Sequence, residues 1–266
     1  MSQPSTDAVA RVLGVSIDAL DMAGALQRIA KMIRERQKGY VCLTGVHGVM
    51  EAQKHPDLSA ILKESALTLP DGAPTAWVGR WQGHQSMRRV AGPDLMIEIF
   101  RRREFAGCTH FLYGGQEGVA EELRKRLEER FPSARVLGTY TPPFRELNAE
   151  EERFFVNLIH GLRPDIVWVG ISTPKQERFM HRYLNRLDTV LMFGVGAAFD
   201  FHTGRIKDAP QWVKTIGMQW LHRLLQDPER LWKRYLRNNS RFLWLMALQF
   251  FGLGKRPAML LHKPTP

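Results

Sequence analysis

The chain has 266 residues, of which 44% are hydrophobic, enough to bury one large core or two small ones. No segment reaches the roughly 18 consecutive apolar residues of a membrane-spanning helix, and there are no repeats or low-complexity tracts. The first ten residues lack the basic and apolar regions of a secretory signal, and the two cysteines lie in apolar segments. We therefore expect a protein of a reducing compartment, without disulfides.

The net charge of +11 is unevenly distributed along the chain. Residues 203–266 hold twelve of the 38 basic residues but only three of the 27 acidic ones, so this last quarter alone carries +9. A positive segment of this kind attracts nucleic acid, anionic lipid headgroups or diphosphates. The same residues are rich in tryptophan and phenylalanine, which favours a membrane surface over a merely solvated tail.

The N-terminal part predicts short strands separated by helices. Strands are expected at 12–17, 40–43 and 67–69. The first helix, capped by Asp21, runs through 25–33, and further helices are expected at 49–53 and 58–63 and after Pro74 and Pro93.

From residue 110 onward the alternation is regular. Apolar strands are expected at 110–113, 135–137, 165–171 and 189–193, and helices at 119–130, 150–162 and 175–187. Near-continuous apolar strands that alternate with helices are typical of an α/β fold with a doubly wound, mostly parallel Rossmann-like sheet. Gly/Pro-rich turns follow these strands, at the edge where open α/β sheets bind ligands.

The C-terminal part predicts helices only. One helix is expected from Pro210 to Gln226 and a second from 229 to about 251, separated by a break at Asp227 and Pro228. Basic residues of the second helix share one face, since they are spaced by three or four: Arg230, Arg234, Arg237 and Arg241. The apolar run that follows packs on the sheet or lies among lipid headgroups. We divide the chain into a catalytic α/β domain, residues 1–202, and a basic, aromatic-rich helical appendage, residues 203–266.

Several familiar sites are missing from the sequence. It contains no Walker phosphate loop, no metal-binding His-Glu-x-x-His helix, no serine elbow and no paired-cysteine zinc motif. There is also no Asp-x-Asp pair, so we expect no metal, and amides, helix ends and arginines would bind phosphate. The turn at Gly114 and Gly115 can face a phosphate but lacks the full dinucleotide fingerprint, so a nicotinamide site remains a weak alternative.

Two acidic residues are candidates for chemistry or binding. Asp71 lies at a strand end, directly before a helix, where it either caps the helix or acts on a substrate. Asp200 follows the glycine turn of the last strand and stands between two phenylalanines, where it either caps a helix or holds a ribose or base.

The motifs of the chain, taken in order from about residue 12 to 237, resemble the WecG/TagA/CpsF family of bacterial glycosyltransferases. The matching segments are Pro70–Gly72, Arg89–Asp94, Tyr113–Gly115, Pro174–Glu177, Gly194–Gly196, Phe199–Phe201, Ala209–Trp212 and Trp220–Leu224. The resemblance implies an inverting transferase that moves a hexose from a UDP-sugar to a polyprenyl-diphosphate-linked sugar, in exopolysaccharide, capsule or wall polymer synthesis. It also implies a cytoplasmic protein, peripheral on the inner face of the cytoplasmic membrane.

The resemblance further implies roles for individual residues. Asp71 is the general base, with Thr44 and Gln176 holding donor or acceptor in the catalytic set. The UDP pocket comprises Arg89, Tyr113, Gly114, Gly115, Gly194, Gly196 and Asp200, and the lipid diphosphate meets Arg223, Arg230, Lys233 and Arg234. The UDP-sugar is a substrate, and no cofactor or nucleic-acid partner is expected. A homo-oligomer is compatible with the sequence.

The sequence departs from the family near Thr44. Val46 stands where the family often has asparagine, and the next residue, His47, either replaces the amide or caps the following helix. N-acetylmannosamine is therefore one donor among several hexoses. Two other classes remain as alternatives: a nicotinamide-dependent oxidoreductase, and a non-catalytic module that binds membranes or nucleic acid through the basic tail.

Overall fold

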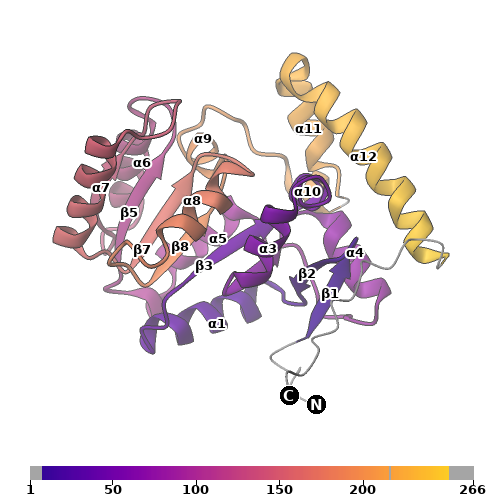
Figure 1. The fold of residues 1–266 in the computed structure, drawn as a ribbon, viewed down its shortest axis with the longest axis horizontal. Coiled ribbons are helices and arrows are strands. Elements are labelled where there is room, and N and C mark those ends of the chain that lie inside the picture. Colours follow the sequence, from indigo (N-terminus) through magenta and orange to yellow (C-terminus); the bar gives the residue numbers. More distant parts are fainter. Residues whose placement is uncertain (1–7, 216, 252–266) are drawn as a thin grey trace, which may run out of the picture.

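A computed structural model describes residues 8–215 and 217–251. Its centre is a sheet of six parallel strands in the order β4-β3-β8-β7-β5-β6 (Figure 1). The strands are β3 (Gly39–Thr44), β4 (Leu67–Pro70), β5 (Thr109–Gly114), β6 (Arg135–Tyr140), β7 (Ile166–Gly170) and β8 (Leu191–Gly194). Parallel strands end at the same edge, so the loops after β3, β4, β5, β7 and β8 gather there.

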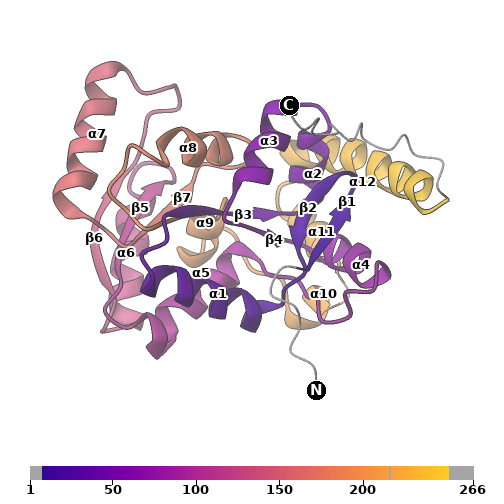
Figure 2. The ribbon, with the colours of Figure 1, turned by 60° about the horizontal axis from the view of Figure 1, so that its bottom comes forward.

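Helices cover both faces of this sheet, which confirms the doubly wound α/β class (Figures 1 and 2). Successive strand residues point to opposite faces, so Tyr113 belongs to one core and Leu112 to the other. The first core is completed by α2 (Val46–Ala52), α3 (Pro56–Glu64), α7 (Ala149–Leu162) and α8 (Lys175–Tyr183). The second is completed by α1 (Met22–Arg34), α5 (Gly92–Arg101), η1 (Arg103–Phe105), α6 (Val119–Arg130) and α9 (Ala198–His202).

The single strand expected at 12–17 is wrong, because this segment forms an antiparallel hairpin of β1 (Val9–Val12) and β2 (Val15–Asp18). Leu13 and Gly14 turn the chain with φ angles of 49° and 84°. The Asp18 carboxylate accepts a hydrogen bond of 2.7 Å from the Thr68 N–H of β4. The hairpin is thereby anchored to the edge of the central sheet.

Only one of the proposed helix caps forms. Asp21 caps α1 as predicted, with its carboxylate 2.8 Å from the Gly24 N–H. The capping interpretation is wrong for Asp71 and His47, because α4 (Ala73–Trp81) and α2 begin after Gly72 and Gly45 without a side-chain cap. The Asp71 carboxylate and the His47 ring therefore have roles other than capping these helices.

The single helix expected from Pro210 to Gln226 is also wrong. The chain forms α10 (Gln211–Thr215) and α11 (Gln219–Gln226) instead. Between them Gly217 has a φ of 74°, and a Cβ added there would lie 2.8 Å from the Cβ of Ala73 in α4. The helix breaks because the backbone turns and closely approaches α4, which only glycine permits without strain. The second predicted helix forms as α12 (Pro228–Phe250).

The helix α12 lies at the end of the molecule opposite α7 (Figures 1 and 2) and contacts α2 and α11. Its inner face buries Leu231 and Phe242. Asn238, only 3% exposed, hydrogen-bonds the His47 ring over 3.0 Å, and the Gln249 side-chain oxygen accepts from the Leu13 N–H over 3.0 Å. The appendage is therefore docked on the α/β part, and its separation as a domain at residue 203 stays a prediction.

Candidate functional site

Neighbouring loops bring Thr44, Asp71 and Arg89 to one place at the carboxyl edge of the sheet. The Asp71 N–H donates to the Thr44 carbonyl over 3.1 Å, and the Val90 N–H donates to the Pro70 carbonyl over 2.9 Å. A Cβ at Gly45 would lie 2.1 Å from the Asp71 carbonyl oxygen, so the loops after β3 and β4 meet only because glycine occupies that position.

The Asp71 carboxyl has the properties of a proton acceptor. The residue is partly open to solvent, and its carboxylate accepts no hydrogen bond from the described part of the chain. Burial raises its pKa to about 6, while Arg89 lowers it and Asp94 raises it. A carboxyl with a pKa near 6 is mostly ionised at neutral pH yet basic enough to take a proton.

Arg89 supplies positive charge beside this carboxyl. Its Nη1 donates to the Asp94 Oδ2 over 2.8 Å. Its buried Nε finds no hydrogen-bond partner among the residues that the structure describes. A buried guanidinium donor left unpaired costs free energy that an anionic substrate group can recover.

Gln176 connects two loops of the site. The side chain is 2% exposed, its amide nitrogen donates to the Gly194 carbonyl over 3.1 Å, and its oxygen accepts from the Gly196 N–H over 3.0 Å. The first turn of α8 is thereby fixed to the glycine turn after β8. This geometry assigns Gln176 to positioning that turn, and direct contact with donor or acceptor stays a prediction.

The turn after β5 offers backbone rather than side chains to a ligand. The Tyr113 ring is buried and stacks on Phe179, with 4.2 Å between ring centroids. Gly114 has a φ of 123°, and a Cβ there would lie 2.6 Å from the Gly170 carbonyl oxygen. The Gly115 N–H donates to that same oxygen over 3.1 Å. Gly114 is thus required by the close approach to β7, and Gly115 by its φ of 76° and by the nearness of Val119, whatever the turn binds.

Asp200 lies inside α9, whose N-cap is Ala197, so its capping interpretation is wrong. Its carboxylate makes no hydrogen bond with the described residues. The main chain of Asp200 is held by the Ile206 N–H, which donates to its carbonyl over 3.1 Å. The side chain therefore remains available to a polar ligand.

The basic residues expected at the lipid diphosphate lie on α11 and α12. The Arg223 guanidinium is 5.9 Å from the centre of the Phe201 ring, next to Asp200 in sequence. The Lys233 ammonium is 5.6 Å from the Trp232 ring. The side chains of Arg230 and Arg234 lie outside the described part of the structure.

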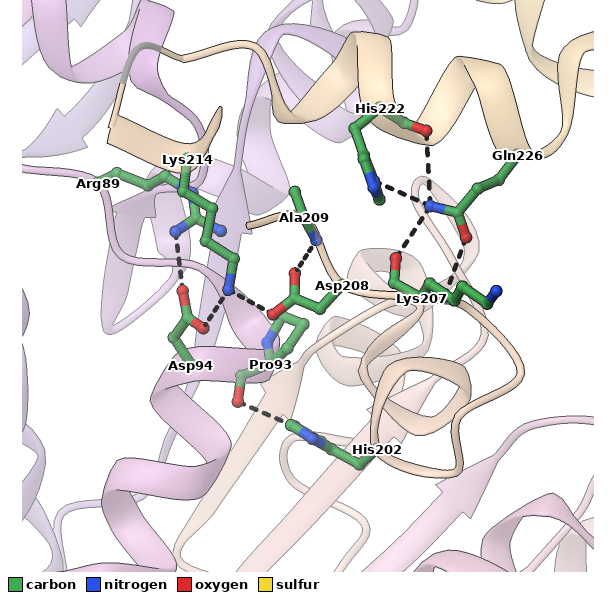
Figure 3. A network of polar contacts seen from close by, with 10 residues as sticks. All are labelled: Arg89, Pro93, Asp94, His202, Lys207, Asp208, Ala209, Lys214, His222 and Gln226. Atoms are coloured by element: carbon green, nitrogen blue, oxygen red, sulfur yellow. Dashed lines mark hydrogen bonds and ion pairs between the residues drawn. The ribbon is translucent and has the colours of Figure 1, made fainter. Parts of the chain in front are cut away.

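Behind Arg89 lies a chain of charged residues that was not predicted from the sequence (Figure 3). Asp94 contacts Arg89 and also Lys214 of α10, whose Nζ lies 3.5 Å from its second oxygen. Lys214 in turn pairs with Asp208. Asp94 could have been identified from the sequence, because it belongs to the segment Arg89–Asp94 that matches the family. Nothing in the sequence pointed to Lys214, because its partners depend on how the appendage docks.

Metal ligands do not gather in the residues 8–215 and 217–251: no three His, Cys, Asp or Glu side chains there are arranged to hold an ion. A donor able to meet an anionic group at this site is the buried Nε of Arg89, which has no partner among the described residues.

Comparison with known proteins identifies the family. The model of the glycosyl transferase WecG/TagA/CpsF family matches residues 10–256. A relative from Bacillus spizizenii strain W23 is 29% identical over 186 residues, which cover 70% of each chain. A second, from Bacillus subtilis strain 168, is 28% identical over 185 residues, again 70% of each. Both are named N-acetylglucosaminyldiphosphoundecaprenol N-acetyl-beta-D-mannosaminyltransferase. With nearly the whole chain matched, this protein belongs to the WecG/TagA/CpsF family and is a glycosyltransferase.

Proposed function

We propose that this enzyme transfers a hexose, with inversion, from a UDP-sugar to a polyprenyl-diphosphate-linked sugar during synthesis of a cell-surface polymer. The observation that carries the proposal is the Asp71 carboxyl, whose pKa burial raises to about 6, beside Arg89, whose Nε has no partner in the described chain. The names of the two relatives support the acceptor class and make N-acetylmannosamine the first donor to test. The family match favours the transferase over both alternative classes.

The proposed reaction is a single displacement. Asp71 takes the proton of the acceptor hydroxyl as its oxygen attacks the anomeric carbon of the donor. The bond from that carbon to the UDP oxygen breaks, and UDP leaves with the electron pair. Arg89 stabilises the phosphate charge that develops, so neither a cofactor nor a metal is needed.

The direct test measures UDP release from a panel of UDP-sugars, with and without a polyprenyl-diphosphate-linked N-acetylglucosamine, in the presence of EDTA. We expect release with one donor, only when the acceptor is present. Release that depends on added Mg²⁺ or Mn²⁺ would contradict the metal-free mechanism. A folded protein that releases UDP from none of the donors would contradict the proposed reaction.

We further propose that the enzyme is peripheral on the inner face of the cytoplasmic membrane, held there by α12. Among the described helices, none is both long and apolar enough to span a bilayer. The exposed apolar side chains of α12 that share one face are Trp232, Leu236, Leu243 and Phe250, spaced by four and seven residues. Arg237 and Arg241 are exposed on another face, an arrangement typical of a helix lying among anionic headgroups.

Replacing Leu236 and Leu243 together by glutamine should weaken binding to anionic vesicles by about tenfold or more, because both side chains lose their burial in the lipid. Cosedimentation with vesicles of phosphatidylglycerol measures the effect. Phe154→Gln is the matched control, since this exposed residue lies on α7 at the opposite end of the molecule. Equal losses in both variants, or none in either, would refute the assignment to α12.

A further inference from the structure

Lys214 connects the appendage to the charged residues at the carboxyl edge of the sheet. It lies on α10, its side chain is only 12% exposed, and its ammonium is between two carboxylates from different segments. One is Asp208, in the linker before α10, and the other is Asp94 in the first turn of α5 (Figure 3). Asp94 uses its other oxygen for the Arg89 guanidinium, 2.8 Å away.

We propose that Lys214 is a positioning residue for sugar transfer: by neutralising Asp94 from the appendage side, it leaves the charge of Arg89 available to Asp71 and to the donor phosphate. The inference rests on the proposed role of Asp71 as the base. It adds that docking of α10 sets the charge state of that base.

The balance of charges explains why one lysine matters. The groups that act on the Asp71 carboxyl are Arg89, which favours its ionised form, and Asp94, which opposes it. With Lys214 in place, Asp94 pairs with two cations, Arg89 and Lys214, while Asp208 pairs with Lys214. Without Lys214, Asp94 keeps only its ion pair with Arg89, Asp208 loses its pair with the lysine, and the potential at Asp71 becomes more negative.

In the part of the chain that the structure describes, no other group replaces the lysine. His202 faces the same two carboxylates, but burial lowers its pKa, so it is neutral at pH 7. Its Nε2 also donates a hydrogen bond to the Pro93 carbonyl, 3.0 Å away. Arg130 acts on the imidazole of His202 and has no ion pair with either Asp94 or Asp208 in the described chain.

The position of α10 makes the lysine sensitive to docking. The chain leaves α10 through Gly217, which packs against Ala73 and Trp77 of α4. That helix begins directly after Asp71 and Gly72. An appendage that moves away from α4 therefore withdraws Lys214 from Asp94 and loosens the helix behind the base in the same step.

The test follows the Asp71 carboxyl directly, by ¹³C NMR titration of the full-length protein, with its signal assigned by its loss in Asp71→Asn. In Lys214→Met we expect the pKa of Asp71 to rise by about 0.5–1 pH unit. The acid limb of the kcat/KM profile should move upward with it, giving about threefold less activity at pH 6. Lys214→Arg should restore both.

Two further variants separate this effect from a general change of charge or structure. Lys207→Met removes an exposed lysine of the same linker and should leave the titration of Asp71 unmoved. In an Asp94→Asn background, Lys214→Met should lose most of its effect, because the carboxylate that it neutralises is gone. If Lys214→Met fails to fold, Lys214→Gln removes the same charge and is titrated in its place.

An unchanged Asp71 titration in a folded Lys214 variant would overturn the proposal. The proposed function fails separately, if Asp71→Asn keeps full transfer activity. In that case the titration still decides whether Lys214 controls the Asp71 carboxyl.

Discussion

Replacing Asp71 by asparagine lowers kcat for sugar transfer by about 10²–10⁴-fold, which is the usual contribution of a positioned general base. Asparagine has the same shape but cannot accept the proton of the acceptor hydroxyl. The substitution also removes a charge that burial penalises, so the melting temperature at pH 7 should not fall. The measurements are steady-state transfer rates, UDP binding by calorimetry and thermal unfolding.

The pH dependence of the wild-type enzyme follows from the same carboxyl. Its pKa of about 6 lies above the usual value, so protonation inactivates the base and transfer falls as the pH drops through 6. Asp71→Asn should lack this limb. Asp188→Asn is the control, because this half-exposed carboxylate pairs with Arg163 and precedes β8, at the opposite edge of the sheet. Activity retained in Asp71→Asn would exclude the residue as the base.

Gln176→Leu should lower the free energy of unfolding by about 2–4 kcal/mol and remove most transfer activity. Leucine fills a similar volume but leaves the Gly194 carbonyl without a donor and the Gly196 N–H without an acceptor, each costing about 1–3 kcal/mol when buried. The glycine turn after β8 then loses its connection to α8. Urea unfolding and UDP affinity measure the two consequences.

The control for this variant is Gln226→Leu. Gln226 makes a similar pair of bonds, to the Lys207 N–H and carbonyl, both 2.9 Å long, but on an exposed surface. Water can replace those bonds, so we expect a cost below about 1 kcal/mol. If Gln176→Leu instead kept full stability and lost activity, Gln176 would act on the substrate, as the family resemblance implies.

The fold was predictable where apolar residues recurred with the spacing of a helix or a strand. The helix α6 begins and ends where the pattern placed it, at Val119 and Arg130, because apolar strands and glycine turns bound it on both sides. The hairpin β1–β2 was missed because its turn has only two residues, one of which, Leu13, is apolar and links the apolar residues of the two strands without a polar gap. The break at Gly217 was missed because its cause is contact with α4.

The candidate site was only partly readable from the sequence. The parallel class places Thr44, which ends β3, and Asp71, which follows β4, at the same edge of the sheet. Their contact depends on the pairing of β3 with β4, which the sequence does not show. The sequence does not show which way a buried side chain points. The side chains of Tyr113 and Gln176 both contact other residues of the protein, Phe179 and Gly194. The pairing of Lys214 with Asp94 depends on the path of the whole appendage, which no local pattern encodes.

The contact between the β1–β2 hairpin and α12 affects the order in which the chain folds during its synthesis. The bond from the Leu13 N–H to the Gln249 side chain joins residues 236 positions apart. The hairpin therefore leaves the ribosome long before its partner. The β–α units can fold as they emerge, whereas this contact forms only after residue 249 has been synthesised. Until then, the surface that receives α12 stays uncovered in the nascent chain.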